Sequence, residues 1–184
     1  MRIVGGKFKG RKLRSVRGTR TRPTADRTRE AIFNIIAFQL QDVRVLDLFA
    51  GTGALGIEAL SRGAQSAVFI DISKPSLSIL RENLAGLCVE SSTRIIRWDI
   101  TANLNCLLSM PRAFDLIFMD PPYNQNLIMP ALGHLHASQS LDSDALVIVE
   151  HSSREPVEPD RLPFDIVDRR QYGKTLVSFL RYVV

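Results

Sequence analysis

The stretch DLFAGTGALG, residues 47–56, decides the fold of this chain. It begins at the end of an apolar run, 43–49, that has the pattern of a buried strand, and it leads into the helical pattern of 54–62. Gly51 and Gly53 permit backbone angles and a close approach that a side chain would block. A turn of this kind, between a strand and a helix, is where α/β proteins bind a ligand at the carboxyl edge of the sheet.

The alternation of strand and helix continues on the C-terminal side of this turn. Each parallel pair needs a crossover connection, so the alternation predicts a parallel sheet with helices on both faces. The last two apolar runs, 164–170 and 175–183, are too close together for a helix between them and predict a hairpin with one antiparallel strand. The other strands are expected at 65–71, 93–98, 114–120 and 145–150, and the other helices from about 22, at 74–86, around 100–109 and at 127–138.

The composition places the chain among globular domains. Its 184 residues are 45% hydrophobic and 23% charged, which excludes collagen-like, low-complexity and wholly disordered classes. No apolar run approaches the roughly 18 residues that a membrane span requires. The two cysteines, Cys88 and Cys106, have neither zinc-site nor redox-pair spacing. We therefore expect a cytoplasmic monomer without a membrane segment or a metal site.

Positive charge is concentrated at the start of the chain. Residues 1–30 hold eleven Lys and Arg residues against two acidic ones, whereas the whole chain has a net charge of +5, so the remainder is mildly acidic. Basic side chains that neutralise phosphates release counterions, which gives salt-sensitive affinity for nucleic acid. We predict a hairpin-like, nucleic-acid-binding extension over 1–21 and a working domain over 22–184, with a merely solubilising tail as the alternative. The expected contacts are Arg2, Lys7, Lys9, Arg11, Lys12, Arg14, Arg17, Arg20 and Arg22.

Acidic residues near the ends of three expected strands indicate the class of cofactor. Asp47 precedes the glycines, where a carboxylate can face an ammonium group but would repel a pyrophosphate. Asp71 can bind ribose hydroxyls, and Asp99 can accept a hydrogen bond from an adenine amino group. With Phe49 and the two glycines, these residues form the predicted site, which favours S-adenosylmethionine (SAM) over a dinucleotide. The alternatives are a solvated acid at Asp47 and a helix cap at Asp99.

The sequence FDLIFMDPPY, residues 114–123, predicts the catalytic site for a nucleobase. An exocyclic base amine is a poor nucleophile because its lone pair is delocalised, so a transferase must stabilise it with hydrogen-bond acceptors. The Asp120 carboxylate and the Pro121 carbonyl can accept its two protons, and the prolines Pro121 and Pro122 hold both acceptors in place. Tyr123 offers a face for an unstacked base, worth roughly 1 to 3 kcal/mol. An ordinary turn is the alternative.

Four motifs together make the chain similar to the RsmD family of SAM-dependent methyltransferases, and the two N-terminal motifs are the most specific. The motifs are RIVGGKFKGRKL at 2–13, RPTADRTREAIFNI at 22–35, DLFAGTGALGIEALSRGA at 47–64 and YGKT at 172–175. The resemblance implies a Rossmann-like, seven-stranded, mostly parallel sheet with an antiparallel last strand. It also implies methylation of N2 of a guanine in 16S ribosomal RNA, in small-subunit particles.

The resemblance assigns roles to the residues of the two sites. Gly51 and Gly53 would cradle SAM, Asp71 would hold its ribose, Asp99 its adenine amine, and residues 120–123 the target guanine. Many relatives have Glu where this chain has Asp71, which is one methylene shorter. The alternatives are an adenine-N6 methyltransferase acting on DNA or RNA, a non-catalytic nucleic-acid-binding protein, and a nicotinamide-dependent oxidoreductase.

Overall fold

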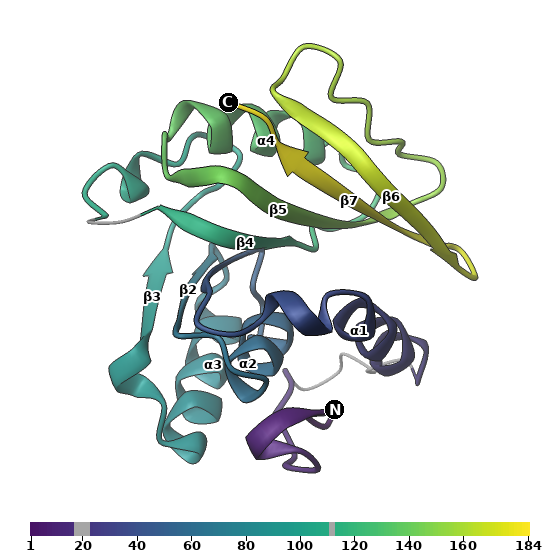
Figure 1. Ribbon diagram of the computed structural model, residues 1–184. Helices are drawn as coiled ribbons and strands as arrows, with labels where there is room; N and C mark the ends of the chain where they lie inside the picture. Colours follow the sequence, from purple (N-terminus) through teal and green to yellow (C-terminus); the bar gives the residue numbers. More distant parts are fainter. Residues whose placement is uncertain (17–22, 111–112) are drawn as a thin grey trace.

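A seven-stranded sheet and four α-helices make up residues 1–16, 23–110 and 113–184, which the computed structural model describes (Figure 1). The elements are α1 Pro23–Ile35, β1 Arg44–Leu48, α2 Ala54–Ser61, β2 Ser66–Asp71, α3 Lys74–Leu87, β3 Thr93–Arg97, β4 Phe114–Met119, α4 Ile128–Ala137, β5 Leu141–Ser152, β6 Phe164–Tyr172 and β7 Thr175–Tyr182.

The strands lie in the order β3-β2-β1-β4-β5-β7-β6. The neighbours from β3 to β5 pair in parallel, whereas β7 pairs antiparallel with both β5 and β6. This confirms the predicted fold class, with its mostly parallel sheet and antiparallel last strand. The chain order reverses between β1 and β4, and ligands of open α/β sheets bind at the carboxyl ends of the strands at such a point.

Helices cover both faces of the sheet, and each face has its own core. Figure 1 shows α1, α2 and α3 on one side of the sheet and α4 on the other. Phe33 of α1 and Leu80 of α3 belong to the first cluster, together with Phe118 of β4. Leu132 of α4 belongs to the second cluster, with Val147 of β5. Burial of both faces explains why the central strands are almost continuously apolar.

The expected helix around 100–109 was wrong, because this segment forms only a single 3-10 turn at Asn105–Leu107. Side chains there bond to the nearby backbone instead: Asp99 Oδ1 accepts from the N–H of Thr101 at 2.9 Å, and Asn103 Oδ1 accepts from that of Asn105 at 2.9 Å. Such local bonds compete with helix formation. The strand expected at 145–150 is also longer than predicted, since β5 covers Leu141–Ser152.

The N-terminal segment 1–16 follows the course of a hairpin, closed by one antiparallel bridge between Arg2 and Lys12. Ile3 donates its N–H to the Arg11 carbonyl at 3.0 Å, and Gly10 donates to the Ile3 carbonyl at 2.8 Å. The predicted domain boundary at residues 21 and 22 lies outside the described residues. None of the helices in the described part of the chain has both the length and the apolar character that crossing a membrane requires.

Candidate active site

The glycine turn after β1 has the backbone conformation that its sequence predicts. Gly51 and Gly53 have φ angles of +54° and +85°, and Phe49 has +58°, a strained value for a bulky residue that is typical of functional turns. A Cβ atom on Gly53 would lie 2.3 Å from Leu80 Cδ1, whereas one on Gly51 would meet nothing within 4 Å. Packing therefore requires Gly53, and Gly51 leaves open space that a cofactor can fill.

Asp71 at the end of β2 holds this turn in place. Its carboxylate accepts hydrogen bonds from the N–H of Gly51 at 2.8 Å and from the N–H of Ser73 at 2.7 Å. A carboxylate has about four acceptor positions, so the predicted ribose contact fits alongside these two bonds. The ribose role of Asp71 stays a prediction, while its role in fixing the turn is a feature of the fold.

Asp47 lies beneath the turn and is only 2% exposed, so the alternative of a solvated acid is wrong. Its Oδ2 accepts the N–H of Gly56, in the first turn of α2, at 2.9 Å. Burial raises the pKa of Asp47 to about 7, and the negative charge of Asp71 adds to the shift. A nearby cation would favour the ionised form, as the predicted ammonium contact requires.

Asp99 lies in a pocket of about 370 Å³ beside the end of β3. Ile72, Trp98 and Asn103 also line this pocket, and the Trp98 ring is held by its Nε1–H, which donates to the Asn103 carbonyl at 3.0 Å. Hydrogen bonds from Thr101 lower the pKa of Asp99. Asp99 therefore makes a local turn and also faces the pocket where the prediction places the adenine.

Strand register brings Asp71 and two more acidic side chains to the same edge of the sheet. One row of directly paired residues crosses four strands and consists of Phe69, Asp47, Phe118 and Ile148. Side chains alternate between faces along a strand, so residues two positions further along point to the same face. These are Asp71 on β2, Asp120 directly after β4 and Glu150 on β5, all toward the side covered by α1–α3.

Asp120 is accessible to solvent and has a strongly raised pKa. The residue exposes surface to solvent, yet protein atoms around its carboxyl group exclude enough water to raise its pKa well above the usual range. The charges of Glu150 and Asp47 raise it further. Gathered like charges favour a cationic ligand and disfavour an anionic one. The site therefore fits SAM, which carries a sulfonium and an ammonium group, better than the pyrophosphate of a dinucleotide.

Tyr123 is fixed by two residues on other elements. Its hydroxyl donates to Glu150 Oε1 at 2.6 Å and lies 3.3 Å from Thr175 Oγ1. Burial and the charge of Glu150 raise the pKa of Tyr123, so it remains a neutral phenol. Tyr123 is 37% exposed and directly follows the buried Pro121 and the exposed Pro122. Its stacking against a base stays a prediction, and the ring is already held in position for it.

Sequence reasoning missed several residues of this site. Glu150 ends an expected strand, and the argument made for Asp71 would have found it. Thr175 belongs to the YGKT motif, but only the β5–β7 pairing shows that it reaches Tyr123. Nothing in the sequence indicates Glu155, a buried acid on the loop after β5 that accepts the N–H of Asn124 at 2.6 Å and so holds the chain after Tyr123.

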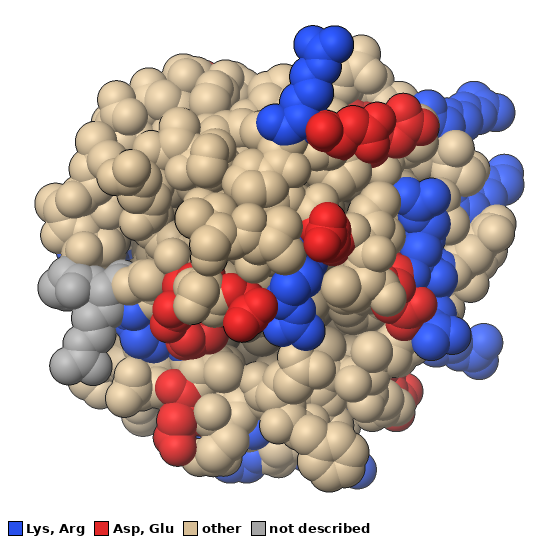
Figure 2. All heavy atoms as spheres, turned by 45° about the horizontal axis from the view of Figure 1, so that its top comes forward, with Lys and Arg blue, Asp and Glu red and all other residues tan. Residues whose placement is uncertain are grey.

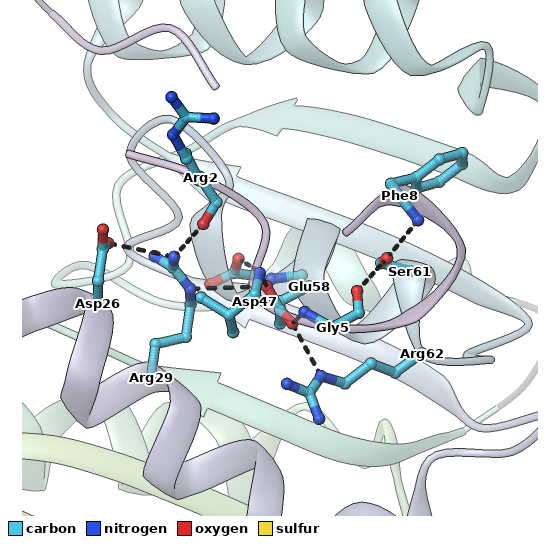
Figure 3. Close-up of polar contacts among 11 residues, drawn as sticks. Arg2, Gly5, Phe8, Asp26, Arg29, Asp47, Glu58, Ser61 and Arg62 are labelled. Atoms are coloured by element: carbon cyan, nitrogen blue, oxygen red, sulfur yellow. Dashed lines mark hydrogen bonds and ion pairs between the residues drawn. The ribbon is translucent and has the colours of Figure 1, made fainter. Parts of the chain in front are cut away.

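Glu58 of α2 attaches the N-terminal segment to the domain, as Figure 3 shows. This fully buried carboxylate accepts the N–H of Val4 at 2.9 Å and of Gly5 at 2.8 Å. Arg62 Nε donates to it at 2.8 Å, and Arg29 of α1 lies 3.7 Å away and also donates to the Arg2 carbonyl. Charge-assisted bonds of this kind are the stronger ones, so segment 1–16 is docked on the helix that follows the glycine turn.

The docked segment runs along α3 toward the carboxyl edge of the sheet. Arg11 donates to the Gly86 carbonyl near the end of α3, and Arg14 forms an ion pair with Glu82, nearer its start. The Asn83 amide bonds to the Arg14 carbonyl at 3.1 Å and to the Thr52 carbonyl of the glycine turn at 3.0 Å. The Asn83 side chain thus links the segment to the predicted cofactor site.

The basic residues predicted to bind nucleic acid lie at the surface wherever the structure describes them. These are Arg2, Lys7, Lys9, Arg11, Lys12 and Arg14, whereas Arg17, Arg20 and Arg22 lie outside the described residues. The β6–β7 hairpin has further exposed basic residues, Arg169, Arg170 and Lys174. Figure 2 shows Lys and Arg side chains along the right-hand edge of the molecule, the side on which this hairpin lies in Figure 1.

The described residues contain no group of three or more His, Cys, Asp or Glu side chains that could hold a metal ion. The groups that meet at the carboxyl edge are instead the glycine turn, the carboxyl groups of Asp71, Asp120 and Glu150, and the fixed ring of Tyr123. This arrangement can hold a cation next to an amine acceptor.

Comparison with known proteins identifies the family of this chain. A family model described as conserved hypothetical protein 95 matches residues 1–181. Ribosomal RNA small subunit methyltransferase D from Haemophilus influenzae is 35% identical over 158 residues (85% of this chain and 81% of that protein), and its Escherichia coli namesake is 36% identical over 150 residues (82% and 74%). A solved structure of the candidate methyltransferase YhhF from Escherichia coli has a TM-score of 0.86 at 30% identity and covers 100% of this chain and 98% of that one. The chain therefore belongs to the RsmD family of SAM-dependent rRNA methyltransferases.

Proposed function

We propose that this protein transfers a methyl group from SAM to the exocyclic N2 of a guanine in small-subunit ribosomal RNA. The observation that carries the proposal is the placement of Asp120 and Tyr123 at the end of β4, next to the glycine turn of β1 across the switch point of the sheet. The names of the relatives support the small-subunit RNA as substrate.

Different residues of the chain bind different functional groups of the cofactor. SAM supplies the methyl group as a sulfonium electrophile. Gly51 gives it room at the turn, Asp47 attracts its ammonium group, Asp71 holds its ribose and Asp99 its adenine amine. The Trp98 ring forms a wall of the adenine pocket.

Asp120 and its neighbours prepare the amine for transfer. The Asp120 carboxylate and the Pro121 carbonyl accept the two N2 protons and keep the nitrogen lone pair out of the ring, and Tyr123 supports the flipped base. The methylated nitrogen then loses a proton, which Asp120 accepts. Its raised pKa makes this carboxylate a better proton acceptor than an ordinary aspartate.

Exposed basic residues of segment 1–16 give the affinity for the RNA backbone. Asn83 links the segment to the glycine turn, so RNA bound to the segment lies near the carboxyl edge that holds Asp120. We further propose that the protein acts as a monomer in the cytoplasm. We also propose small-subunit particles as its substrate, because its relatives are named for the small subunit and presentation of one guanine requires a folded RNA.

The experiment is to incubate the protein with methyl-labelled SAM and unmodified small ribosomal subunits, digest the RNA and identify the labelled nucleoside. We expect N2-methylguanosine. Labelled N6-methyladenosine would keep the Asp120 chemistry but favour the adenine alternative, and no label on particles or naked RNA would overturn the proposal.

Asp120→Ala is the matched control for that assay. It should abolish labelling and leave SAM affinity within a few fold, because Asp120 acts on the amine. Affinity can be followed by the fluorescence of Trp98, the single tryptophan of the chain, which lines the adenine pocket. Equal loss of transfer and of SAM binding would contradict the role given to Asp120.

A further inference from the structure

Glu150 has a position that methyl transfer to an amine does not by itself explain. In the β4–β5 register Met119 pairs with Val149, so Asp120, the residue directly after β4, is next to Glu150 of β5 at the carboxyl edge, and the two carboxyl groups interact electrostatically. Two carboxylates this close repel each other, and each raises the cost of ionising the other. The Asp120 carboxylate and the Pro121 carbonyl already suffice for the two amine protons, so a second carboxylate must have another use.

Glu150 is also held in a defined orientation. The Tyr123 hydroxyl donates to its Oε1 at 2.6 Å, and the same hydroxyl lies 3.3 Å from Thr175 Oγ1 of β7. Burial raises the pKa of Glu150, and the hydrogen bond from Tyr123 offsets part of that rise. A carboxylate has about four acceptor positions, so this bond leaves Glu150 able to accept from a ligand lying between Tyr123 and Asp120.

The edges of the two purines differ in what such an acceptor would meet. Next to its N2 amine, guanine has a protonated N1, which is a second donor. Next to its N6 amine, adenine has an unprotonated N1, which is an acceptor. A carboxylate beside Asp120 therefore matches the guanine edge and opposes the adenine edge with a lone pair against a lone pair.

We propose that Glu150 selects guanine over adenine by accepting the N1–H of the target base, while Asp120 and the Pro121 carbonyl accept the protons of its amine. This inference rests on the proposed function and adds a specificity residue to it. It also explains why the Tyr123 hydroxyl, which Thr175 contacts, holds Glu150: a carboxylate that reads one position of a base must be fixed relative to the ring that supports the base.

The test compares guanine with 2-aminopurine, which keeps the 2-amine but has an unprotonated N1 and no oxygen at C6. The guanine that the wild-type protein labels in small subunits is located first. Small-subunit RNA with either base at that position is then made by splinted ligation and assembled into particles. We expect kcat/KM of the wild-type protein to be about 30-fold higher on guanine, within the range for loss of one good base contact.

Glu150→Gln should remove most of this preference. Its amide can accept from the N1–H of guanine and can also donate to the bare N1 of 2-aminopurine, so we expect the two substrates to differ by about threefold or less. Equal wild-type rates on both bases, or an unchanged preference in Glu150→Gln, would overturn the proposal.

Tyr123→Phe separates base reading from ring positioning. This variant keeps the aromatic face and the Glu150 carboxylate but removes the bond between them, so the preference for guanine should persist even where the rate falls. If Glu150 served only to hold Tyr123, both variants would show the same preference. Glu158→Gln, an exposed residue on the loop after β5, is the control for loss of one negative charge and should leave rate and preference unchanged.

The outcomes keep the two proposals apart. If the wild-type protein labels no guanine in the particles, the proposed function fails. If it labels guanine and 2-aminopurine equally well, only the role of Glu150 fails. Circular dichroism and the Trp98 fluorescence response to SAM show whether each variant is folded and binds the cofactor.

Discussion

Asp47 is a buried carboxyl group beneath the glycine turn, and its burial decides its charge. The sequence places it before the glycines and predicts a contact with an ammonium group. It cannot reveal that the side chain is 2% exposed and bonded to Gly56, because that depends on how α2 packs against β1. Burial makes Asp47 half protonated near neutral pH, so its charge depends on the cation that it is expected to bind.

This predicts a pH dependence of SAM binding. The pKa of Asp47 is raised to about 7, so the carboxylate is mostly protonated at pH 6 and mostly ionised at pH 8. A bound ammonium group favours the ionised form, so SAM affinity should rise about tenfold from pH 6 to pH 8. Isothermal titration calorimetry measures it directly. Asp47→Asn keeps an acceptor for Gly56 and should flatten the dependence, and an equally steep profile in that variant would contradict the assignment.

At the scale of elements, strand and helix periodicity predicted the βα units correctly, since the strands are buried on both faces and the helices have one apolar face. The error at 100–109 arose from Asp and Asn side chains that bond to the backbone. The N-terminal segment was predicted as a basic extension, but Ile3 and Leu13 are 1% and 6% exposed and belong to the core cluster of α2 and α3. Truncation would therefore damage the core and cannot test RNA binding cleanly.

Charge substitutions in the segment test RNA binding without that damage. Lys7, Lys9 and Lys12 are exposed, so replacing all three with Ala should leave the fold intact. The slope of log affinity for small-subunit RNA against log salt concentration should become shallower by about 2, since each phosphate contact contributes roughly 0.7. Filter binding across a salt series measures it. Arg94→Ala, on β3 at the edge of the sheet, is the control, and an equal effect there would show that any surface charge suffices.

At the scale of the whole molecule, the site is assembled from both halves of the sheet. The glycine turn, Asp71 and Asp99 come from β1–β3, and residues 120–123, Glu150 and Thr175 come from β4–β7. The sequence predicts that the glycine turn, Asp71, Asp99 and residues 120–123 share the carboxyl edge, because parallel strands end there. It does not reveal strand register or the pairing of β5 with β7, which place Glu150 beside Asp120 and Thr175 at Tyr123.

SAM bound at the carboxyl edge, against the residues of β1–β3, should stabilise the folded chain. At a SAM concentration of about 100 times Kd, the free energy of unfolding should rise by about 2.7 kcal/mol. For a domain of this size that corresponds to an increase in Tm of about 5 to 10 °C. Thermal denaturation followed by circular dichroism measures the shift. NAD at the same concentration should give none, and an equal shift with NAD would revive the oxidoreductase alternative.

The hydrogen bonds from the N-terminal segment to Glu58 determine which positions of that segment tolerate substitution. Glu58 holds the backbone amides of Val4 and Gly5, groups that nearly every amino acid provides. Only a few positions are tied to the docking itself, such as Gly6, where a Cβ atom would lie 1.8 Å from the Ser61 carbonyl oxygen. Arg11 and Arg14 also attach the segment to α3. Lys7, Lys9 and Lys12 are exposed, so substitutions at these three positions can change the charge of the segment while its attachment through Glu58 stays the same.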